Sequence, residues 1–82
     1  MKIPGINDRM AQILKLIYED PDRILNTKEI KARFNVSAYT ARTDLKTLVE
    51  FGFLDIIQVN KKKQVFIKSQ NFDDVIKKFN IA

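Results

Sequence analysis

Three residue types are missing from this sequence of 82 residues: cysteine, histidine and tryptophan. Their absence excludes disulfides, thiolate or imidazole metal sites, and any mechanism that uses a cysteine nucleophile or a histidine base. Glycine occurs only twice, so there is little material for flexible ligand loops. The acidic residues Glu19, Asp20 and Asp22 flank a turn, and the pair Asp73-Asp74 suits a helix N-terminus better than a catalytic dyad. We therefore expect no enzyme activity, no cofactor and no metal from this chain.

Long apolar runs are also missing. The longest stretch is about four residues, from Phe51 to Leu54, against the roughly 20 that cross a bilayer. The first residues include Pro4, Asp8 and Arg9 where a signal peptide would be apolar. We expect a cytoplasmic protein without membrane contact.

Positive charge exceeds negative charge, and it is unevenly placed. The chain has 15 Lys and Arg against 10 Asp and Glu, a net charge of +5. Residues 1–22 sum to −1, whereas residues 23–51 and 52–82 each sum to +3. This gradient fits a protein whose middle and C-terminal parts face a polyanion, although the same charge would also keep a small domain in solution. The globular composition, 45% hydrophobic and 30% charged, favours one domain over residues 1–82.

Hydrophobic spacing predicts a first helix that starts at Asn7 or Asp8 and ends before Asp20-Pro21-Asp22. Ile24-Leu25 follows as a short extended piece. Asn26 or Thr27 can cap a brief second helix that buries Ile30 and Phe34. About three residues later, after Asn35 in a left-handed turn and Val36 in the core, Ser37 can cap a third helix. This is helix-turn-helix spacing.

The third helix is predicted to run to Phe51 and to end at Gly52. At 100° per residue one sector is apolar and should be buried: Ala38, Ala41, Leu45, Leu48 and Val49. The opposite face is polar and rich in hydroxyl groups, and should be exposed: Tyr39, Thr43, Lys46, Thr47 and Glu50.

Two short strands over residues 54–59 and 64–67 are predicted to form a β-hairpin with a basic tip. Asn71 can cap a last helix that carries Phe72, Val75, Ile76 and Phe79 at core spacing. The resulting fold is α+β: a winged helix-turn-helix with a three-helix core, a β-hairpin wing and one additional C-terminal helix.

Two motifs resemble known regulators. The stretch from Val36 to Leu54 reads V-S-A-Y-T-A-R-T-D-L, then L-V-E-F-G-F-L, and it resembles the V-S-x-x-T-x-R-R-D-L and L-x-x-x-G pattern of DeoR-type regulators. It is more similar still to the C-terminal winged-helix domain of bacterial Fic-family proteins. In that domain an Asn-Asp-Arg run, here residues 7–9, precedes the first helix, and a T-A-x-x-D-L core, here residues 40–45, follows.

The resemblance implies a regulatory module that binds duplex DNA, and it implies that the chain could be the C-terminal part of a larger Fic-family protein. Two departures qualify this. Thr43 stands where the DeoR pattern has a second basic residue, which weakens direct base reading. The Fic catalytic signature H-P-F-x-x-G-N-G-R is absent, so AMP transfer would reside in another domain.

The candidate DNA-binding residues lie on the third helix and at the wing tip. They are Ser37, Tyr39, Thr40, Arg42, Thr43, Lys46, Thr47, Lys61, Lys62 and Lys63. Each has a structural alternative: Ser37 can simply cap its helix, Thr40 can bond the nearby backbone, and Arg42 can lie along the core edge or pair with Asp44. Lysines at a hairpin tip can also serve only to prevent strand pairing.

A different class of function stays open at this point. The same domain could be an interaction module that forms a homodimer or docks beside a Fic catalytic domain. Thr43, the outward Glu50, and a last helix with Phe72 and Phe79 favour that alternative.

Overall fold

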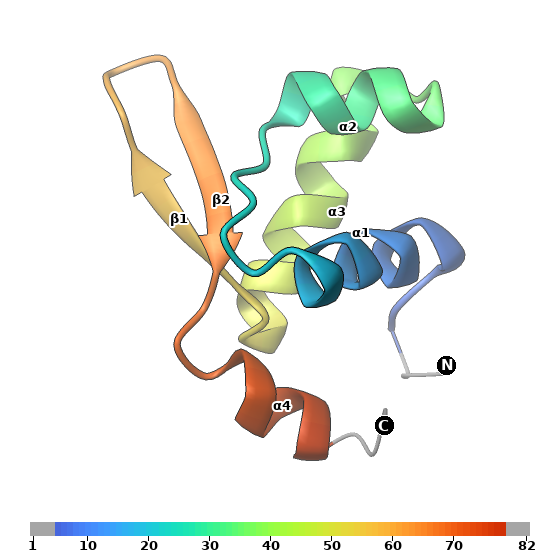
Figure 1. Cartoon of the computed structure of the whole chain (residues 1–82). Coiled ribbons are helices and arrows are strands. Elements are labelled where there is room, and N and C mark those ends of the chain that lie inside the picture. Colours follow the sequence, from blue (N-terminus) through green and yellow to red (C-terminus); the bar gives the residue numbers. More distant parts are fainter. Residues whose placement is uncertain (1–4, 79–82) are drawn as a thin grey trace.

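The computed structural model describes residues 5–78. Three helices form the centre of the molecule: α1 (Asp8–Glu19), α2 (Thr27–Phe34) and α3 (Ala38–Phe51). A hairpin of β1 (Leu54–Gln58) and β2 (Gln64–Lys68) follows, and α4 (Phe72–Lys78) comes last. Figure 1 shows the hairpin beside the helices, with its tip and α4 at opposite ends of the molecule. The predicted order of elements is confirmed.

Side-chain caps explain where the helices begin. The side chain of Asn7 accepts a hydrogen bond from the backbone N–H of Met10 (2.8 Å) at the start of α1. Asn26 does the same for Glu29 (2.7 Å) at α2, and Ser37 caps α3. Each cap satisfies an N–H that has no partner inside its helix.

Left-handed residues end two of the helices. Asn35 follows α2 with φ 53°, and Gly52 follows α3 with φ 92°. Asn and Gly tolerate this backbone region at little steric cost. The turn after Asn35 sets α2 across α3, as the sequence predicts for a helix-turn-helix.

Two antiparallel strands form the wing, with Ile56 opposite Phe66 and Gln58 opposite Gln64. Leu25 adds a bridge on the other side of β2. Its N–H donates to the Phe66 carbonyl (2.8 Å), and the Phe66 N–H donates back (2.8 Å). The expected extended piece therefore makes a single β-bridge to β2, and this bridge holds the start of α2 beside the wing.

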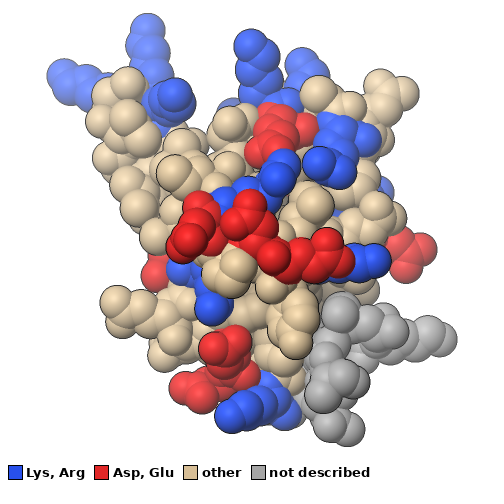
Figure 2. Space-filling view, viewed as in Figure 1, with Lys and Arg blue, Asp and Glu red and all other residues tan. Residues whose placement is uncertain are grey.

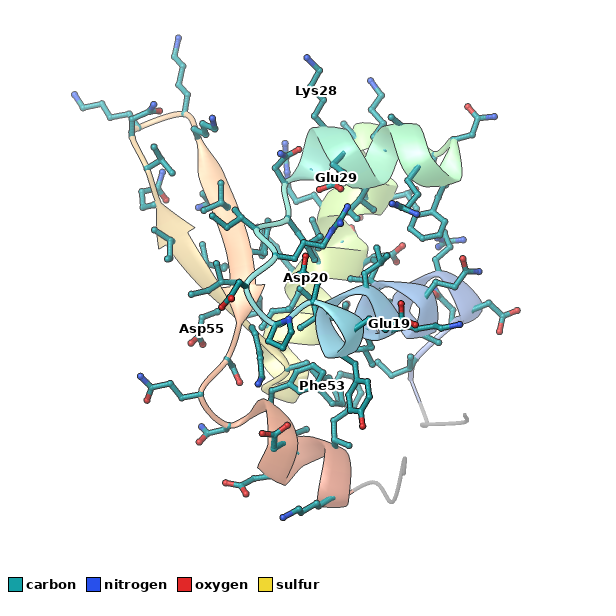
Figure 3. All side chains as sticks on the ribbon, in the orientation of Figure 1. Glu19, Asp20, Lys28, Glu29, Phe53 and Asp55 are labelled. Carbon is teal, nitrogen blue, oxygen red and sulfur yellow. The ribbon has the colours of Figure 1, made fainter. Side chains whose placement is uncertain are left out.

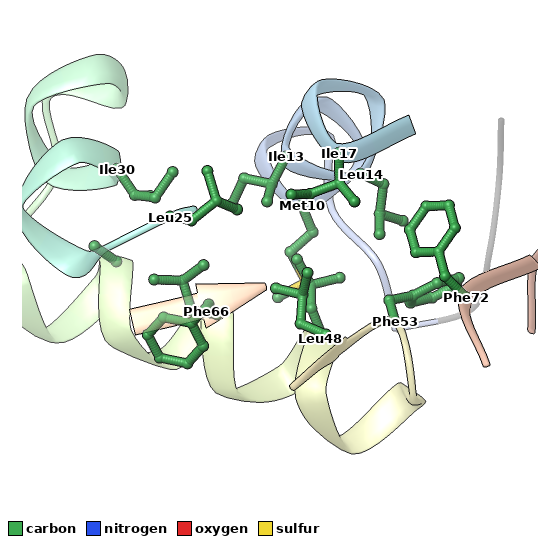
Figure 4. Packing of buried hydrophobic residues seen from close by; sticks show 13 residues of the cluster. Met10, Ile13, Leu14, Ile17, Leu25, Ile30, Leu48, Phe53, Phe66 and Phe72 are labelled. Atoms are coloured by element: carbon green, nitrogen blue, oxygen red, sulfur yellow. The ribbon is translucent and has the colours of Figure 1, made fainter. Parts of the chain in front are cut away.

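One apolar core lies between α1, α3 and the inner face of the hairpin (Figure 4). Ile13, Ile17 and Leu45 are completely buried, and Phe66 closes the core from the sheet. α4 joins this core through Phe72, whose ring meets Phe53 edge-on at a centroid distance of 5.8 Å. Burial of such side chains contributes about 1.5–3 kcal/mol each.

Some local expectations were wrong. Ala38 is exposed rather than buried, because it lies in the first turn of α3, beyond the reach of the core, which begins at Ala41. Asp44, which lies outside the predicted apolar sector, is buried at 2% exposure. β1 ends one residue early at Gln58, since Val59 already belongs to the turn and its N–H donates to the Lys63 carbonyl (2.9 Å). β2 runs one residue longer than expected, to Lys68.

Phe72 was predicted at core spacing and, under the alternative function only, as part of a docking surface; it is 1% exposed and is a core residue. Phe79, the other aromatic residue of that expectation, lies outside the described residues. Within residues 5–78, no helix has the length and apolar character that a bilayer crossing requires.

Candidate nucleic-acid interface

A polar stripe runs along the outer side of α3. Tyr39 is 77% exposed, and Arg42, Thr43 and Lys46 are exposed as well. Residues spaced by three, four and seven positions share one side of a helix, so these four side chains form one continuous surface. Glu50 is exposed at the far end of the helix. The predicted exposure of this side of α3 is confirmed for Tyr39, Thr43, Lys46 and Glu50.

The N-terminus of α3 is held by two hydroxyl groups. Ser37 Oγ accepts a hydrogen bond from the Thr40 N–H (3.1 Å) and donates one to Thr40 Oγ1 (3.0 Å). Both hydroxyls thus have a structural role at this helix start. The Thr40 hydroxyl thus has the Ser37 hydroxyl as its partner, and not the nearby backbone group that the structural alternative predicted.

Thr47 differs from the rest of the expected stripe. It is half-buried, and its hydroxyl donates to the Thr43 carbonyl one turn earlier (2.9 Å). The hydrogen of this hydroxyl is therefore already used, and only its acceptor capacity remains for a ligand. Among the predicted residues of α3, Thr47 is the least available.

The wing tip is an ordered turn that presents three lysines. The Asn60 and Lys63 backbones exchange two hydrogen bonds of 3.3 Å each, and Asn60 Oδ1 accepts from the Lys62 N–H (2.9 Å). Lys61, Lys62 and Lys63 are all exposed. Gln58 also donates from Nε2 to the Asn60 carbonyl and accepts from Gln64 Nε2 (2.8 Å). These bonds fix where the lysines emerge.

A groove of about 530 Å³ lies between the wing, α3 and the start of α2. It brings together Arg42 and Lys46 from the middle of the chain and all three wing lysines. Thr40, Thr43 and Tyr39 do not line it. The remaining lining residues are Asn26, Thr27, Lys28, Gln58 and Gln64.

This basic groove carries charge of one sign only, since six of its ten lining residues are Lys or Arg and none is acidic. None of the six forms an ion pair within the described part of the chain. Figure 2 shows basic side chains at the wing tip and over α2, with a hollow between them. Most acidic side chains of this view lie lower on the molecule, where Figure 3 labels Glu19 and Asp20, whereas Glu29 lies on α2 beside the basic side chains.

Nearby carboxylates are neutralised by other partners. Glu29 pairs with Arg23. Asp44 Oδ2 accepts from Arg9 Nε at 2.8 Å, and this hydrogen bond, together with the Asp44 charge, raises the pKa of Arg9. The predicted alternative in which Arg42 pairs with Asp44 is therefore wrong, because Asp44 points inward and Arg42 points into the groove. Arg42 keeps its charge available to a ligand.

Sequence reasoning missed four of the polar lining residues: Asn26, Thr27, Gln58 and Gln64. The two glutamines flank the wing tip at paired positions, so the hairpin register would have found them. Asn26 and Thr27 depend on the Leu25–Phe66 bridge, a contact across 41 positions that no local pattern encodes. Lys28 of α2 is a further basic lining residue, and it is exposed.

Comparison with known proteins gives one family and several related folds. The sequence model of a family described as HTH domain matches residues 9–65, which is more than half of the chain. No curated protein matches the sequence.

Solved structures with the same fold include a protein of the archaeon Sulfolobus tokodaii. It has 22% identity and a TM-score of 0.74, and the match covers 93% of this chain and 74% of that one. A protein of Methanosarcina mazei, described as a possible transcriptional regulator, has 20% identity and a TM-score of 0.73, with 94% and 69% covered. A transcriptional regulator of Thermotoga maritima has 21% identity and a TM-score of 0.66, with 94% and 53% covered. The architecture is thus a winged helix.

Proposed function

The chain belongs to the family of HTH domains, and from that premise we propose that it is a regulatory module that binds duplex DNA. The observation that carries the proposal is the basic groove, where six uncompensated cations adjoin the exposed polar stripe of α3. A duplex needs both features, since cations neutralise phosphates while a slim polar helix reads base edges. The transcriptional regulators among the similar structures support the same conclusion.

Phosphate binding is the task of the basic groove. Arg42 and Lys46 project into it from α3, and Lys61, Lys62 and Lys63 face them from the wing. A DNA strand whose backbone entered the groove would meet positive charge on both sides. Contacts of this kind fix the orientation of the protein and carry no sequence information themselves.

Base reading is assigned to the exposed stripe. Tyr39 and Thr43 are exposed on α3 outside the basic groove, and position 43 has no basic residue that could bind a guanine. Hydroxyl groups both donate and accept, so Thr43 discriminates less than an arginine that makes two hydrogen bonds to guanine. We infer a modest sequence preference, with Thr47 contributing least because its hydroxyl is engaged.

Ser37 and Thr40 are proposed both to hold the start of α3 and to help bind a phosphate there. Their side chains hold the first turn of α3 together, and the remaining backbone N–H groups of that turn point outward. A helix N-terminus with free N–H groups and a positive dipole end favours a phosphate. The two hydroxyls therefore orient an anion-binding turn as well as cap it.

A matched pair of double variants tests the phosphate-binding assignment. Arg42→Ala with Lys46→Ala removes two groove charges, and Lys15→Ala with Lys77→Ala removes two exposed charges on α1 and α4. In titrations of a labelled duplex, the groove pair should weaken binding to every sequence and reduce the salt slope by about 2. The control pair should change the slope much less. Equal losses from both pairs would mean that only net charge matters.

A finer proposal concerns the context of the module. The motifs at residues 7–9 and 40–45 resemble those of Fic-family proteins, in which this domain would adjoin a catalytic domain for AMP transfer. The whole stretch over residues 36–54 also resembles DeoR-type regulators. Arg9 belongs to the first Fic-like motif and Asp44 to the second, and the two residues form an ion pair. This contact gives a structural reason for the presence of both residues. The partner domain stays a proposal, tested by the full reading frame of the gene.

A further inference from the structure

The outer edge of β1 is open. The sheet order is β1-β2, with the Leu25 bridge on the far side of β2. Within the described residues β1 therefore has a neighbour on one side only. Figure 1 shows β1 at the margin of the molecule with no helix or strand beside its outer edge.

The hydrogen bonds of β2 reveal which groups of β1 face outward. Phe66 exchanges both of its backbone bonds with Leu25, so it has none for Ile56, its partner in the register. In an antiparallel pair hydrogen-bonded and non-hydrogen-bonded residues alternate. At the other end of the strand the Val59 N–H donates to the Lys63 carbonyl (2.9 Å). Residues 59 and 63 are therefore a hydrogen-bonded position, which agrees with the alternation deduced from Phe66. Ile56, and with it Leu54 and Gln58, therefore direct N–H and C=O groups away from β2.

The side chains of this edge do nothing to block it. Ile56, Ile57 and Val59 are 39%, 45% and 54% exposed, and residues 54–59 include no lysine, arginine or proline. Asp55 is the single charged residue of the strand. Natural proteins protect open strand edges with lysine, proline or a bulge, and β1 has none of these. An edge of this kind is suited to pairing.

We propose that β1 pairs antiparallel with β1 of a second copy, about a two-fold axis that passes beside Ile56. In this register Ile56 lies opposite Ile56 of the partner subunit, and Leu54 lies opposite Gln58 of the partner subunit. All outward backbone groups then meet a complementary group, giving about six hydrogen bonds. An antiparallel pair of identical strands is self-complementary, as a two-fold interface requires.

Charge favours this arrangement of two copies. Because paired strands run in opposite directions, the two tips with Lys61–Lys63 lie at opposite ends of the joined four-stranded sheet. The pairing strand contributes only Gln58 to the basic groove, and it includes no residue of the exposed stripe of α3. A contact of one short strand is small compared with stable interfaces, so the dimer is expected to be weak and to dissociate on dilution.

Sedimentation equilibrium of the full chain tests the proposal. A concentration series up to about 1 mM should show a dimer fraction that rises with concentration. Ile56→Lys places like charges on both sides of the axis and should leave a monomer. Gln70→Lys adds the same charge at an exposed position after β2 and should keep the dimer. Circular dichroism confirms that each variant is folded.

A crosslink supplies an independent readout, because the natural sequence has no cysteine. The Cα atoms of a hydrogen-bonded antiparallel pair are about 5.5 Å apart, within the range of a disulfide. Ile56→Cys should form a covalent dimer on mild oxidation, and Lys62→Cys, at the separated tips, should do so far more slowly. A chain that is monomeric throughout the series, a dimer unaffected by Ile56→Lys, or equal crosslinking at both positions would each overturn the proposal.

Discussion

Arg9 on α1 donates from Nε to Oδ2 of Asp44 on α3, across 2.8 Å and 35 positions of sequence. The Asp44 side chain is 3% exposed and that of Arg9 is 37% exposed. A buried carboxylate is tolerated only when it is paired and hydrogen-bonded. The pair thus ties the first helix to the inner side of the helix whose outer side is proposed to read DNA.

The two halves of this pair should not be equally important. Arg9→Ala leaves a buried carboxylate without a partner, whereas Asp44→Asn leaves an arginine that can turn to solvent. We therefore expect Arg9→Ala to lower the midpoint of thermal unfolding more than Asp44→Asn does, and the double variant to be less damaging than the sum of both. Equal and additive losses would show that the two side chains act independently.

The pH dependence of the pair has a definite sign. Asp44 raises the pKa of Arg9, and a raised pKa gives stability that is lost only as the pH rises through the raised value. The contribution of the Arg9 charge to stability should therefore be constant from neutral to mildly alkaline pH. Chemical denaturation at several pH values within that range measures it.

Gly52 should resist substitution. Its φ of 92° is a conformation that L side chains rarely adopt, and an added Cβ would lie 3.2 Å from Cγ2 of Val75 on α4. Gly52→Ala is expected to cost about 1–2 kcal/mol of unfolding free energy. The matched control is Asn35→Gly, at a left-handed position where glycine fits, which should cost little or stabilise. Urea denaturation distinguishes the two, and a neutral Gly52→Ala would contradict the strain argument.

Substitution of Ser37 can separate its two proposed roles. Ser37→Ala removes the cap and should cost about 1 kcal/mol of stability. Ser37→Asp keeps a good cap and complements the helix dipole, but it places negative charge where a phosphate is proposed to bind. We expect it to preserve the unfolding midpoint and to weaken DNA binding strongly. Unchanged affinity would leave Ser37 as a cap alone.

The wing lysines should act mainly through charge. Changing Lys61, Lys62 and Lys63 together to Ala should leave the turn folded, because its hydrogen bonds come from the backbone and from Asn60. If each lysine neutralises one phosphate, the slope of log affinity against log salt becomes less steep by about 3. An unchanged slope would exclude the wing from the interface.

The sequence predicted the elements well because they depend on local chemistry. Asn7, Asn26 and Ser37 act as caps, and Gly52 ends α3, as their residue types suggest. Periodicity could not predict the exposure of Ala38 or the burial of Asp44, since burial depends on which elements pack against each turn of the helix. Asp44 became a buried residue only because Arg9 arrives from another helix.

The candidate site was predictable in part for the same reason. The exposed stripe of α3 follows from helical spacing, and the basic wing tip follows from three consecutive lysines. The groove between them depends on the Leu25–Phe66 bridge, which is a tertiary contact. That bridge is what adds Asn26 and Thr27 to the site.

The most direct test of the account is a titration of the unmodified chain with duplex DNA at several salt concentrations. If about four to six phosphates are neutralised, log affinity should fall with log salt at a slope near −4 to −5. Absence of measurable binding even at low salt would contradict the claim that the exposed side of α3 and the basic groove form a DNA-binding surface.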